Sequence, residues 1–167
     1  AMSVSTFGED GYPQSRVVLL KGYSEKGITF FTDYSSIKGK AIEKNPKVSC
    51  LFFWPELERQ VRITGIAQKT PANISDAYFQ SRPVTSQIAA IISNQSEEIV
   101  NREFLEKRFF DMQNKLQGKI PKRPDSWGGF LVSPVKFEFW QGRESRLHDR
   151  ILYEKQEENW TIKRLSP

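Results

Sequence analysis

The sequence predicts a mainly β fold with a helical insertion, in which short antiparallel strands form a closed or half-closed barrel. Roughly eight apolar runs of strand length follow one another at short spacing. In the middle of the chain the apolar pattern changes to a helical period. Neither a GxGxxG motif nor a P-loop follows any of the runs, which disfavours a doubly wound α/β fold.

The first three strands are predicted to form an antiparallel meander. Met2–Phe7 alternates weakly, and residues 8–11 (Gly-Glu-Asp-Gly) are typical of a hairpin turn. Ser15–Tyr23 is rich in Val and Leu, which predicts a strand buried on both faces. A second turn at residues 24–27 leads to a strand over Ile28–Thr32.

A short helix is predicted next, followed by another strand. Ser35 or Ser36 can cap the helix, because a serine hydroxyl accepts a hydrogen bond from a free amide of the first turn. Pro46 ends it, since the residue before a proline avoids helical backbone. Val48–Phe53 is then expected to be a strand.

Arg59–Lys69 is predicted to form a long strand with an alternating pattern. Its apolar face is expected to hold Val61, Ile63 and Ile66. Gly65 suggests a β-bulge within this strand.

The middle of the chain is predicted to be helical, and its end returns to strands. The three expected helices are Ile74–Gln80, Ser86–Ile92 and Arg102–Gln117. The last of these places its apolar side chains on one face, namely Leu105, Phe109, Met112 and Leu116. The final strands are expected at Gly129–Val132, Lys136–Gln141, Arg150–Glu154 and Trp160–Leu165.

Composition narrows the class of protein. A chain of 167 residues fits one domain, and one cysteine excludes an internal disulfide. Cys50 stands in an apolar run and is expected to be a small buried hydrophobe. One Cys and one His disfavour a metal site. Neither a bilayer-spanning run nor a secretory signal pattern is present, so a cytoplasmic protein without a membrane partner is expected.

The net charge of +5 comes from basic residues that are scattered and often flanked by acids. Such a distribution disfavours a nucleic-acid partner and leaves individual Arg and Lys residues as possible phosphate ligands.

The densest group of chemically active side chains lies at Phe137–Arg150, where an aromatic strand leads into a polar loop. Arg146, His148 and Arg150 occupy alternate positions, so in an extended segment they would point to one side. They could then converge on an anionic or aromatic ligand, because a guanidinium binds two phosphate oxygens at once. The alternative is a surface loop whose arginines pair with acidic neighbours.

Three further groups could bind phosphate, and each also has an ordinary structural explanation. Arg16–Lys21 places two basic residues around four apolar ones, which also suits a core strand with charged ends. Lys38 stands near a helix N-terminus, where phosphates bind, but could simply be exposed. Tyr78, Arg82 and Ser86 would share a helix face, although Pro83 interrupts a simple helix.

Together these segments resemble the pyridoxine (pyridoxamine) 5′-phosphate oxidase family over nearly the whole chain. The most specific match is FEFWQ, four variable residues, then RLHDR, at Phe137–Arg150. Further matches follow in family order at Arg16–Lys21 (RVVLLK), Leu57–Val61 (LERQV), Tyr78–Gln87 (YFQSRPVTSQ), Gln95-Ser96, Trp127–Phe130 (WGGF) and Arg164–Pro167 (RLSP).

The resemblance implies an FMN-binding split β-barrel, with residues 1–167 as one domain and FMN at the interface of a homodimer. The family usually carries a further N-terminal segment upstream of the region that begins this chain. Arg16 and Lys38 would hold the FMN phosphate. The other implied cofactor contacts are Val17, Val18, Leu19, Leu20, Lys21, Phe31, Thr32, Gln60, Gln95, Ser96, Trp140 and Arg150, some of them from the second subunit.

The resemblance also implies the reaction and its substrate site. Pyridoxine or pyridoxamine 5′-phosphate would be oxidised by O2 to pyridoxal 5′-phosphate and H2O2, with ammonia released from the amine. A hydride would pass from substrate C4′ to flavin N5. The substrate phosphate would be held by Lys21, Tyr78, Arg82 and Ser86, while Arg146 and His148 would lie over the pyridine ring as catalytic residues.

Two positions depart from the family pattern, because Ile37 stands where Arg is frequent and Phe31 where Tyr is common. Two other functions remain possible on the same barrel, namely a non-catalytic pyridoxal-phosphate carrier and a flavin oxidoreductase with another substrate. A carrier needs no flavin site, and a substrate without phosphate needs no Lys21, Tyr78, Arg82 and Ser86 together. A nucleic-acid-binding barrel would need a basic face interleaved with aromatics.

Overall fold

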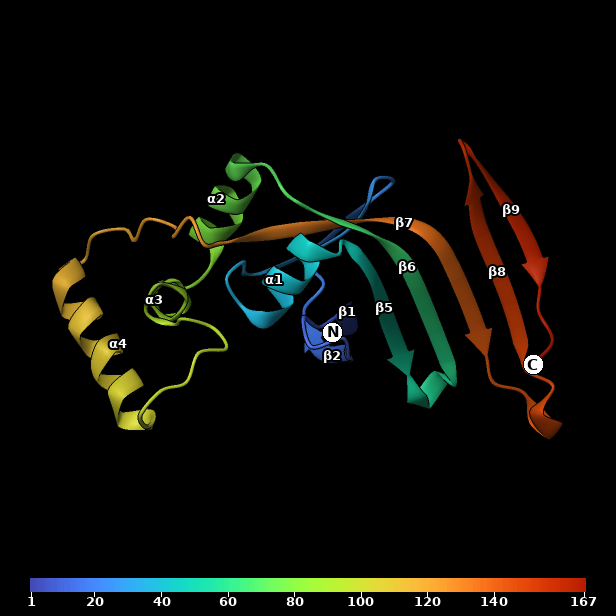
Figure 1. Cartoon of the computed structure of the whole chain (residues 1–167), viewed down its shortest axis with the longest axis horizontal. Helices are drawn as coiled ribbons and strands as arrows, with labels where there is room; N and C mark the ends of the chain where they lie inside the picture. Colours follow the sequence, from blue (N-terminus) through green and yellow to red (C-terminus); the bar gives the residue numbers. More distant parts are fainter. The chain divides into compact units, whose positions relative to one another are not determined.

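The computed structural model describes residues 1–167, which contain nine strands and four α-helices (Figure 1). The strands are β1 (Met2–Phe7), β2 (Pro13–Val18), β3 (Gly22–Ser24), β4 (Gly27–Asp33), β5 (Lys47–Trp54), β6 (Arg59–Lys69), β7 (Trp127–Gln141), β8 (Asp149–Gln156) and β9 (Asn159–Arg164). The helices are α1 (Ile37–Lys44), α2 (Ala72–Ser81), α3 (Val84–Ile92) and α4 (Arg102–Leu116). Two 3-10 turns, η1 (Pro55–Leu57) and η2 (Glu144–Arg146), complete the set.

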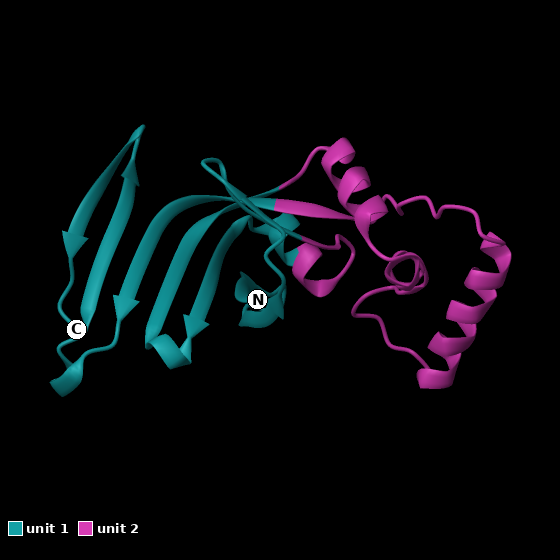
Figure 2. Cartoon of the chain, turned by 180° about the vertical axis from the view of Figure 1, so that it is seen from behind, with its two compact units in different colours: residues 1–30, 41–68, 131–167 teal, residues 31–40, 69–130 magenta.

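The chain forms two compact units, coloured separately in Figure 2. Unit 1 consists of residues 1–30, 41–68 and 131–167, and unit 2 of residues 31–40 and 69–130. The first contains most of the sheet, and the second contains α2, α3 and α4. The expectation of one folding domain over residues 1–167 stays a prediction.

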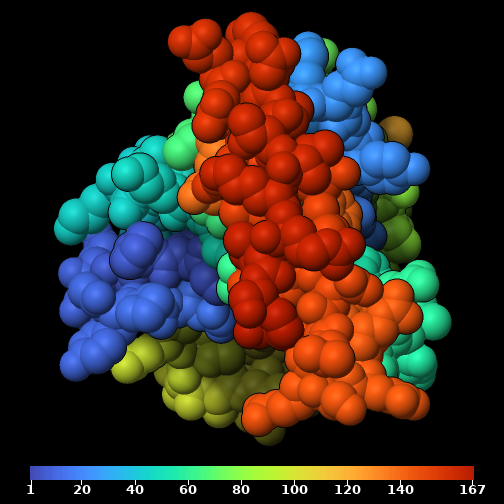
Figure 3. Space-filling view, turned by 90° about the vertical axis from the view of Figure 1, so that its right-hand side faces the viewer, coloured from blue at the N-terminus to red at the C-terminus, as the bar shows by residue number.

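The strands join in one sheet in the order β2-β1-β5-β6-β7-β4-β3, with β8 on β7 and β9 on β8. The pairs β1–β2, β1–β5, β3–β4, β5–β6, β7–β8 and β8–β9 are antiparallel. The mainly β prediction with a helical insertion is therefore confirmed. Figure 3 shows the β8–β9 hairpin in red. Ile162 on β9 is exposed.

The core of unit 1 lies where alternating strand positions turn inward. Met2, Val4 and Cys50 are almost fully buried on β1 and β5, as the alternation predicts. Cys50 is thus the small buried hydrophobe expected, and burial raises the pKa of its thiol to about 12. In unit 2, Phe79 on α2 and Ile88 on α3 are almost fully buried.

The prediction of a fully buried strand over Ser15–Tyr23 is wrong. β2 ends at Val18, its residues alternate between exposed and half-buried, and Val17 is 71% exposed. β2 lies at one end of the strand order, and an antiparallel edge strand can leave one face in solvent. A separate short strand, β3, begins at Gly22.

The bulge expected at Gly65 is also absent from the β5–β6 ladder, which pairs Val48 with Gly65 in unbroken register. Glycine is needed at position 65 for a different reason, because a Cβ there would lie 2.5 Å from the backbone oxygen of Ser133. Ala67 rather than Ile66 continues the buried face, because the period of two is never interrupted.

The remaining elements follow the predictions closely. Ser36 caps α1, since its Oγ accepts the backbone N–H of Gly39 at 3.2 Å. The two strands expected around Pro134 are one strand, β7, and the proline precedes the segment from residue 136 that pairs with β8. No helix of the structure is long and apolar enough to span a membrane.

Candidate active site

In unit 2, four of the proposed cofactor residues meet at the N-terminus of α1. Lys38 Nζ donates to Thr32 Oγ1 at 2.9 Å and also to Gln95 Oε1. The Thr32 hydroxyl donates to the same Gln95 oxygen at 3.0 Å. Ser96 Oγ accepts the backbone N–H of Ile37 at 3.4 Å. The segment after α3 therefore folds back onto the turn that opens α1.

The turn before α1 is built by short polar side chains. Asp33 accepts the Ser35 backbone N–H at 2.7 Å, and the Ser36 hydroxyl donates to the Asp33 backbone oxygen at 2.6 Å. These bonds set the direction in which α1 begins. A helix N-terminus carries partial positive charge, which Lys38 reinforces. The group can bind an anion such as a phosphate monoester.

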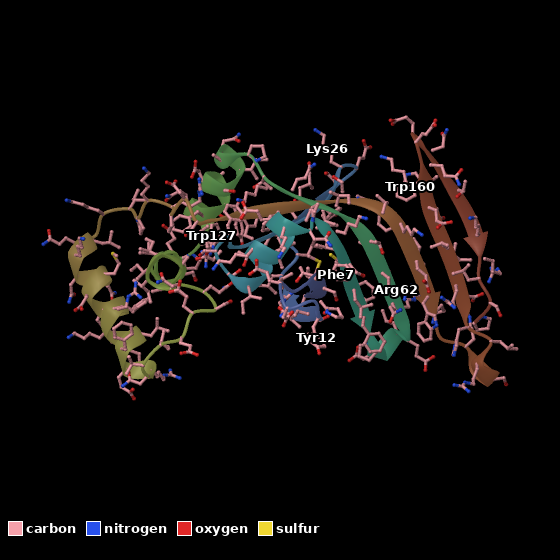
Figure 4. All side chains as sticks on the ribbon, in the orientation of Figure 1. Phe7, Tyr12, Lys26, Arg62, Trp127 and Trp160 are labelled. Carbon is pink, nitrogen blue, oxygen red and sulfur yellow. The ribbon has the colours of Figure 1, made fainter.

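A second group in unit 2 is an aromatic stack. The Phe31 ring lies 4.0 Å from that of Tyr78 and 5.6 Å from that of Trp127, nearly parallel to both. The guanidinium of Arg82 lies 4.8 Å from the Trp127 ring centroid, a cation–π distance. Figure 4 labels Trp127 at the start of β7. The stack thus holds Tyr78 and Arg82 next to one another.

Arg82 lies at the junction of α2 and α3 and is poorly satisfied within the chain. Its Nη1 is buried and has no hydrogen-bond partner. Burial lowers the pKa of this guanidinium, although Tyr78 opposes the shift. A buried cationic donor without a partner is costly, so the arrangement fits an anionic ligand.

The interruption expected at Pro83 is confirmed, so Tyr78, Arg82 and Ser86 do not share the face of one helix. Tyr78 belongs to α2, which ends at Ser81, and Arg82 has extended backbone. Pro83 is the N-cap of α3, which begins at Val84, so Ser86 lies in the first turn of that helix.

In unit 1, Arg16 is fixed from β2 against β1. Its Nη1 donates to Thr6 Oγ1 at 2.8 Å, and its Nη2 donates to Gln14 Oε1 at 3.1 Å. Burial lowers the pKa of this guanidinium. After it, Val17 and Leu19 are exposed while Val18 and Leu20 are half-buried. The exposed Lys21 donates its backbone N–H to Thr29 at 2.9 Å.

His148 is held in one orientation. The backbone N–H of Arg143 donates to its Nδ1 at 3.1 Å, and the imidazole lies 4.9 Å from the Trp140 ring. Because Nδ1 accepts a hydrogen bond, the neutral ring carries its proton on Nε2. His148 therefore presents an N–H donor at Nε2.

The single extended segment assumed for Arg146, His148 and Arg150 is wrong, whereas their convergence on one ligand stays a prediction. Arg146 ends the η2 turn with φ of 62° and is exposed, so the period of two does not hold across it. The loop alternative is partly right, because Arg143 pairs with Asp149 at 2.9 Å. Hydrogen bonds from Arg143 and, to a smaller extent, from Arg164 lower the pKa of Asp149.

Arg150 is instead held by a carboxylate. Its Nε donates to Glu138 at 2.9 Å and its Nη1 to the backbone oxygen of Ser166 at 2.9 Å. Gln60 and Trp140 line one pocket of about 250 Å³ in unit 1.

The sequence analysis assigned no role to Trp127 or Glu138, although both lie inside the matched motifs and contact proposed site residues. Trp127 opens WGGF, and Glu138 is the second residue of FEFWQ. Their contacts come from distant segments, which no local pattern reveals. The first glycine of WGGF has a steric cause, since a Cβ at Gly128 would lie 2.2 Å from the Tyr34 hydroxyl.

Comparison with known proteins agrees with these motifs. Residues 1–115 match the family described as pyridoxamine 5′-phosphate oxidase, and residues 127–167 match its C-terminal dimerisation region, described for pyridoxine 5′-phosphate oxidase. A protein of Flavobacterium johnsoniae named pyridoxine/pyridoxamine 5′-phosphate oxidase is 58% identical over 99% of this chain and 78% of its own.

Solved structures give the same fold. PhzG from Burkholderia lata, in complex with tetrahydrophenazine-1-carboxylic acid, superposes with a TM-score of 0.94 at 29% identity, over 100% of this chain and 82% of its own. A pyridoxamine 5′-phosphate oxidase-related, FMN-binding protein of Nostoc punctiforme gives 0.78 at 17% identity, over 99% and 86%. The fold is therefore the split β-barrel, and the chain belongs to the pyridoxamine 5′-phosphate oxidase family.

Proposed function

We propose that this protein is a pyridoxal 5′-phosphate synthase that oxidises pyridoxine or pyridoxamine 5′-phosphate with O2. The products are pyridoxal 5′-phosphate and H2O2, with ammonia from the amine after water adds. FMN, when bound, supplies the acceptor for the hydride that leaves C4′ and passes its electrons to O2. This is the last step in making and salvaging the vitamin B6 cofactor, and we place it in the cytoplasm.

One observation carries the choice of a phosphorylated substrate. Arg82 Nη1 is buried without a partner, beside Tyr78 and close in sequence to Ser86. The donors of this group fit a phosphate, with Lys21 as the further cation that the family pattern assigns. A substrate without a phosphate would leave the buried guanidinium unsatisfied.

The donors at the N-terminus of α1 fit the second phosphate, that of FMN. Lys38, Thr32, Gln95 and Ser96 already meet there and present hydroxyl, amide and ammonium groups. Arg16 would add a second cation, and Phe31 an apolar contact next to the flavin. The Ile37 backbone N–H already donates to Ser96 Oγ and its side chain carries no guanidinium, so one charged contact is absent.

The remaining contacts are proposed for the flavin ring and the pyridine ring. Val17–Leu20, Gln60, Trp140 and Arg150 would surround the flavin. His148 would donate from Nε2 to the 4′ substituent and orient C4′ toward the flavin. Stacking of the two rings lowers the entropic part of the barrier to hydride transfer. Arg146, exposed on its turn, would lie over the pyridine ring.

The match to a dimerisation region supports a homodimer that acts on a small molecule. We propose that FMN binds at the interface, so that each site draws residues from both subunits.

The test is turnover in air. Purified protein is mixed with FMN and pyridoxine 5′-phosphate, and pyridoxal 5′-phosphate is followed by its absorbance. We expect many turnovers per protein, dependent on FMN, and lost in Arg146→Ala and His148→Ala. If FMN binds but no turnover occurs, the proposed substrate is wrong. If neither FMN binding nor turnover occurs, the proposal that the protein is this enzyme is wrong.

A second candidate is oxidation of a reduced phenazine, which the similarity to PhzG favours. A turnover assay with tetrahydrophenazine-1-carboxylic acid in place of the vitamin separates the two. The unpartnered Arg82 predicts that the phosphorylated substrate gives the higher kcat/KM.

A further inference from the structure

Glu138 is a buried carboxylate shared by two arginines. Its side chain is 6% exposed, and its two oxygens accept from Arg62 Nη2 at 2.5 Å and Arg150 Nε at 2.9 Å. The three residues come from β6, β7 and β8, and Figure 4 labels Arg62 on β6. A carboxylate buried this deeply is tolerated because both oxygens are paired with cations.

The sheet places Glu138 on the same face as the proposed flavin contacts. Trp140 lies directly opposite Arg150 in the β7–β8 ladder, and Glu138 is two residues from Trp140. Side chains two apart on a strand share a face, and paired residues of adjacent strands do so too. Glu138, Trp140 and Arg150 therefore line one surface.

The bonds to Arg150 leave a defined part of its guanidinium available. Nε is bound to Glu138, and Nη1 donates to the backbone oxygen of Ser166 at 2.9 Å. With these two atoms bonded, the planar group cannot rotate freely, and we take Nη2 as the donor that remains for a ligand. The side chain is 28% exposed, so a ligand can reach it.

We propose that Glu138 is a positioning residue that orients Arg150 for the cofactor. This role rests on the proposed function, because it requires Arg150 to contact FMN. The carboxylate fixes the guanidinium through a charge-assisted bond, and Arg62 compensates the second oxygen. Glu138 itself touches neither cofactor nor substrate.

The sheet also offers a matched control. Glu154 on β8 bridges Lys136 at 2.8 Å and Lys163 at 2.7 Å, so it too is a carboxylate between two cations. None of these three residues belongs to the proposed site. Glu154→Gln therefore reports what the loss of such a carboxylate does to the fold alone.

The experiment is a double-mutant cycle on FMN affinity, followed by the quenching of flavin fluorescence on binding to the full-length chain. Glu138→Gln keeps the shape and loses the charge, and we expect FMN to bind roughly tenfold more weakly. Arg150→Met should weaken binding as well. Because Glu138 acts through Arg150, adding Glu138→Gln to Arg150→Met should have no further effect, whereas Glu154→Gln should leave affinity unchanged.

Two results would overturn the role: an unchanged FMN affinity in Glu138→Gln, or an effect that adds fully to that of Arg150→Met. If Glu138→Gln does not fold, Glu138→Asp keeps the charge but shortens the reach to Arg150, and the same cycle is run with it. A wild-type chain that neither binds FMN nor turns over substrate would instead refute the proposed function. Normal wild-type turnover with an unaffected variant refutes the positioning role alone.

Discussion

At the scale of single residues, the proposed substrate site depends on Trp127 as much as on the cation it holds. Trp127 is 7% exposed and lies under the Arg82 guanidinium, with Tyr78 stacked on the same group of rings. Tryptophan gives the strongest cation–π attraction of the aromatic side chains. A half-buried arginine whose Nη1 has no hydrogen-bond partner depends on such a contact to stay in place.

Trp127→Phe should therefore raise KM for pyridoxine 5′-phosphate with little change in kcat. Loss of about 1 kcal/mol of attraction corresponds to roughly a fivefold rise. Phosphate binding is uniform between ground and transition states, so the loss appears in KM. Steady-state kinetics measure both constants. Trp160→Phe, at a ring that packs on Phe137, is the control and should change neither. A fall in kcat alone would contradict the expectation.

Motifs identified the residues, but not their partners. The sequence placed Lys38, Thr32, Gln95 and Ser96 in one site by family pattern, and the structure brings them together. The extended backbone predicted after Gly142 is wrong, because Ser145 and Arg146 have positive φ angles. Such backbone angles are set by the surrounding fold and leave no signal in residue type.

At the scale of elements, strand β6 was predicted with its observed bounds, yet its glycine was misinterpreted. A pattern of alternating apolar residues reveals a strand and its faces, but not which neighbouring backbone approaches it. The close approach at Gly65 comes from Ser133 on β7, which is distant in sequence. The same limit explains why the two predicted strands around Pro134 proved to be one.

Gly65→Ala should destabilise the protein by about 1–3 kcal/mol, because the added methyl group must displace backbone rather than a flexible side chain. Urea unfolding followed by circular dichroism measures the change. Gly22→Ala is the matched control within the sheet, since its Cβ would meet Thr29 at 3.7 Å, an ordinary contact. Equal effects of the two substitutions would show that the strand glycines act through chain entropy instead.

At the scale of the whole molecule, the proposed sites are divided between parts of the chain. Thr32, Lys38, Tyr78, Arg82 and Ser86 lie in unit 2, whereas Arg16, Lys21, Trp140, His148 and Arg150 lie in unit 1. The membership of this set is a prediction that rests on ordered motifs in the sequence. The proposed completion of the set by a second subunit would depend on assembly, which the pattern of one chain does not encode.

If FMN binds at the interface of a homodimer, its affinity must depend on protein concentration. Only the dimer then presents a whole site, so FMN stabilises the dimer over the separated subunits, by about 2.7 kcal/mol at a free concentration 100 times its dissociation constant. We expect the increase in Tm on adding FMN to become larger as the protein concentration rises. Dilution of the protein below the dimer dissociation constant should release bound flavin. Thermal unfolding at several protein concentrations, with and without FMN, measures this linkage. Riboflavin, which lacks the phosphate, is the control ligand and should give a smaller gain. A gain in Tm independent of protein concentration, in a protein that sediments as a monomer with flavin bound, would place the cofactor within one subunit.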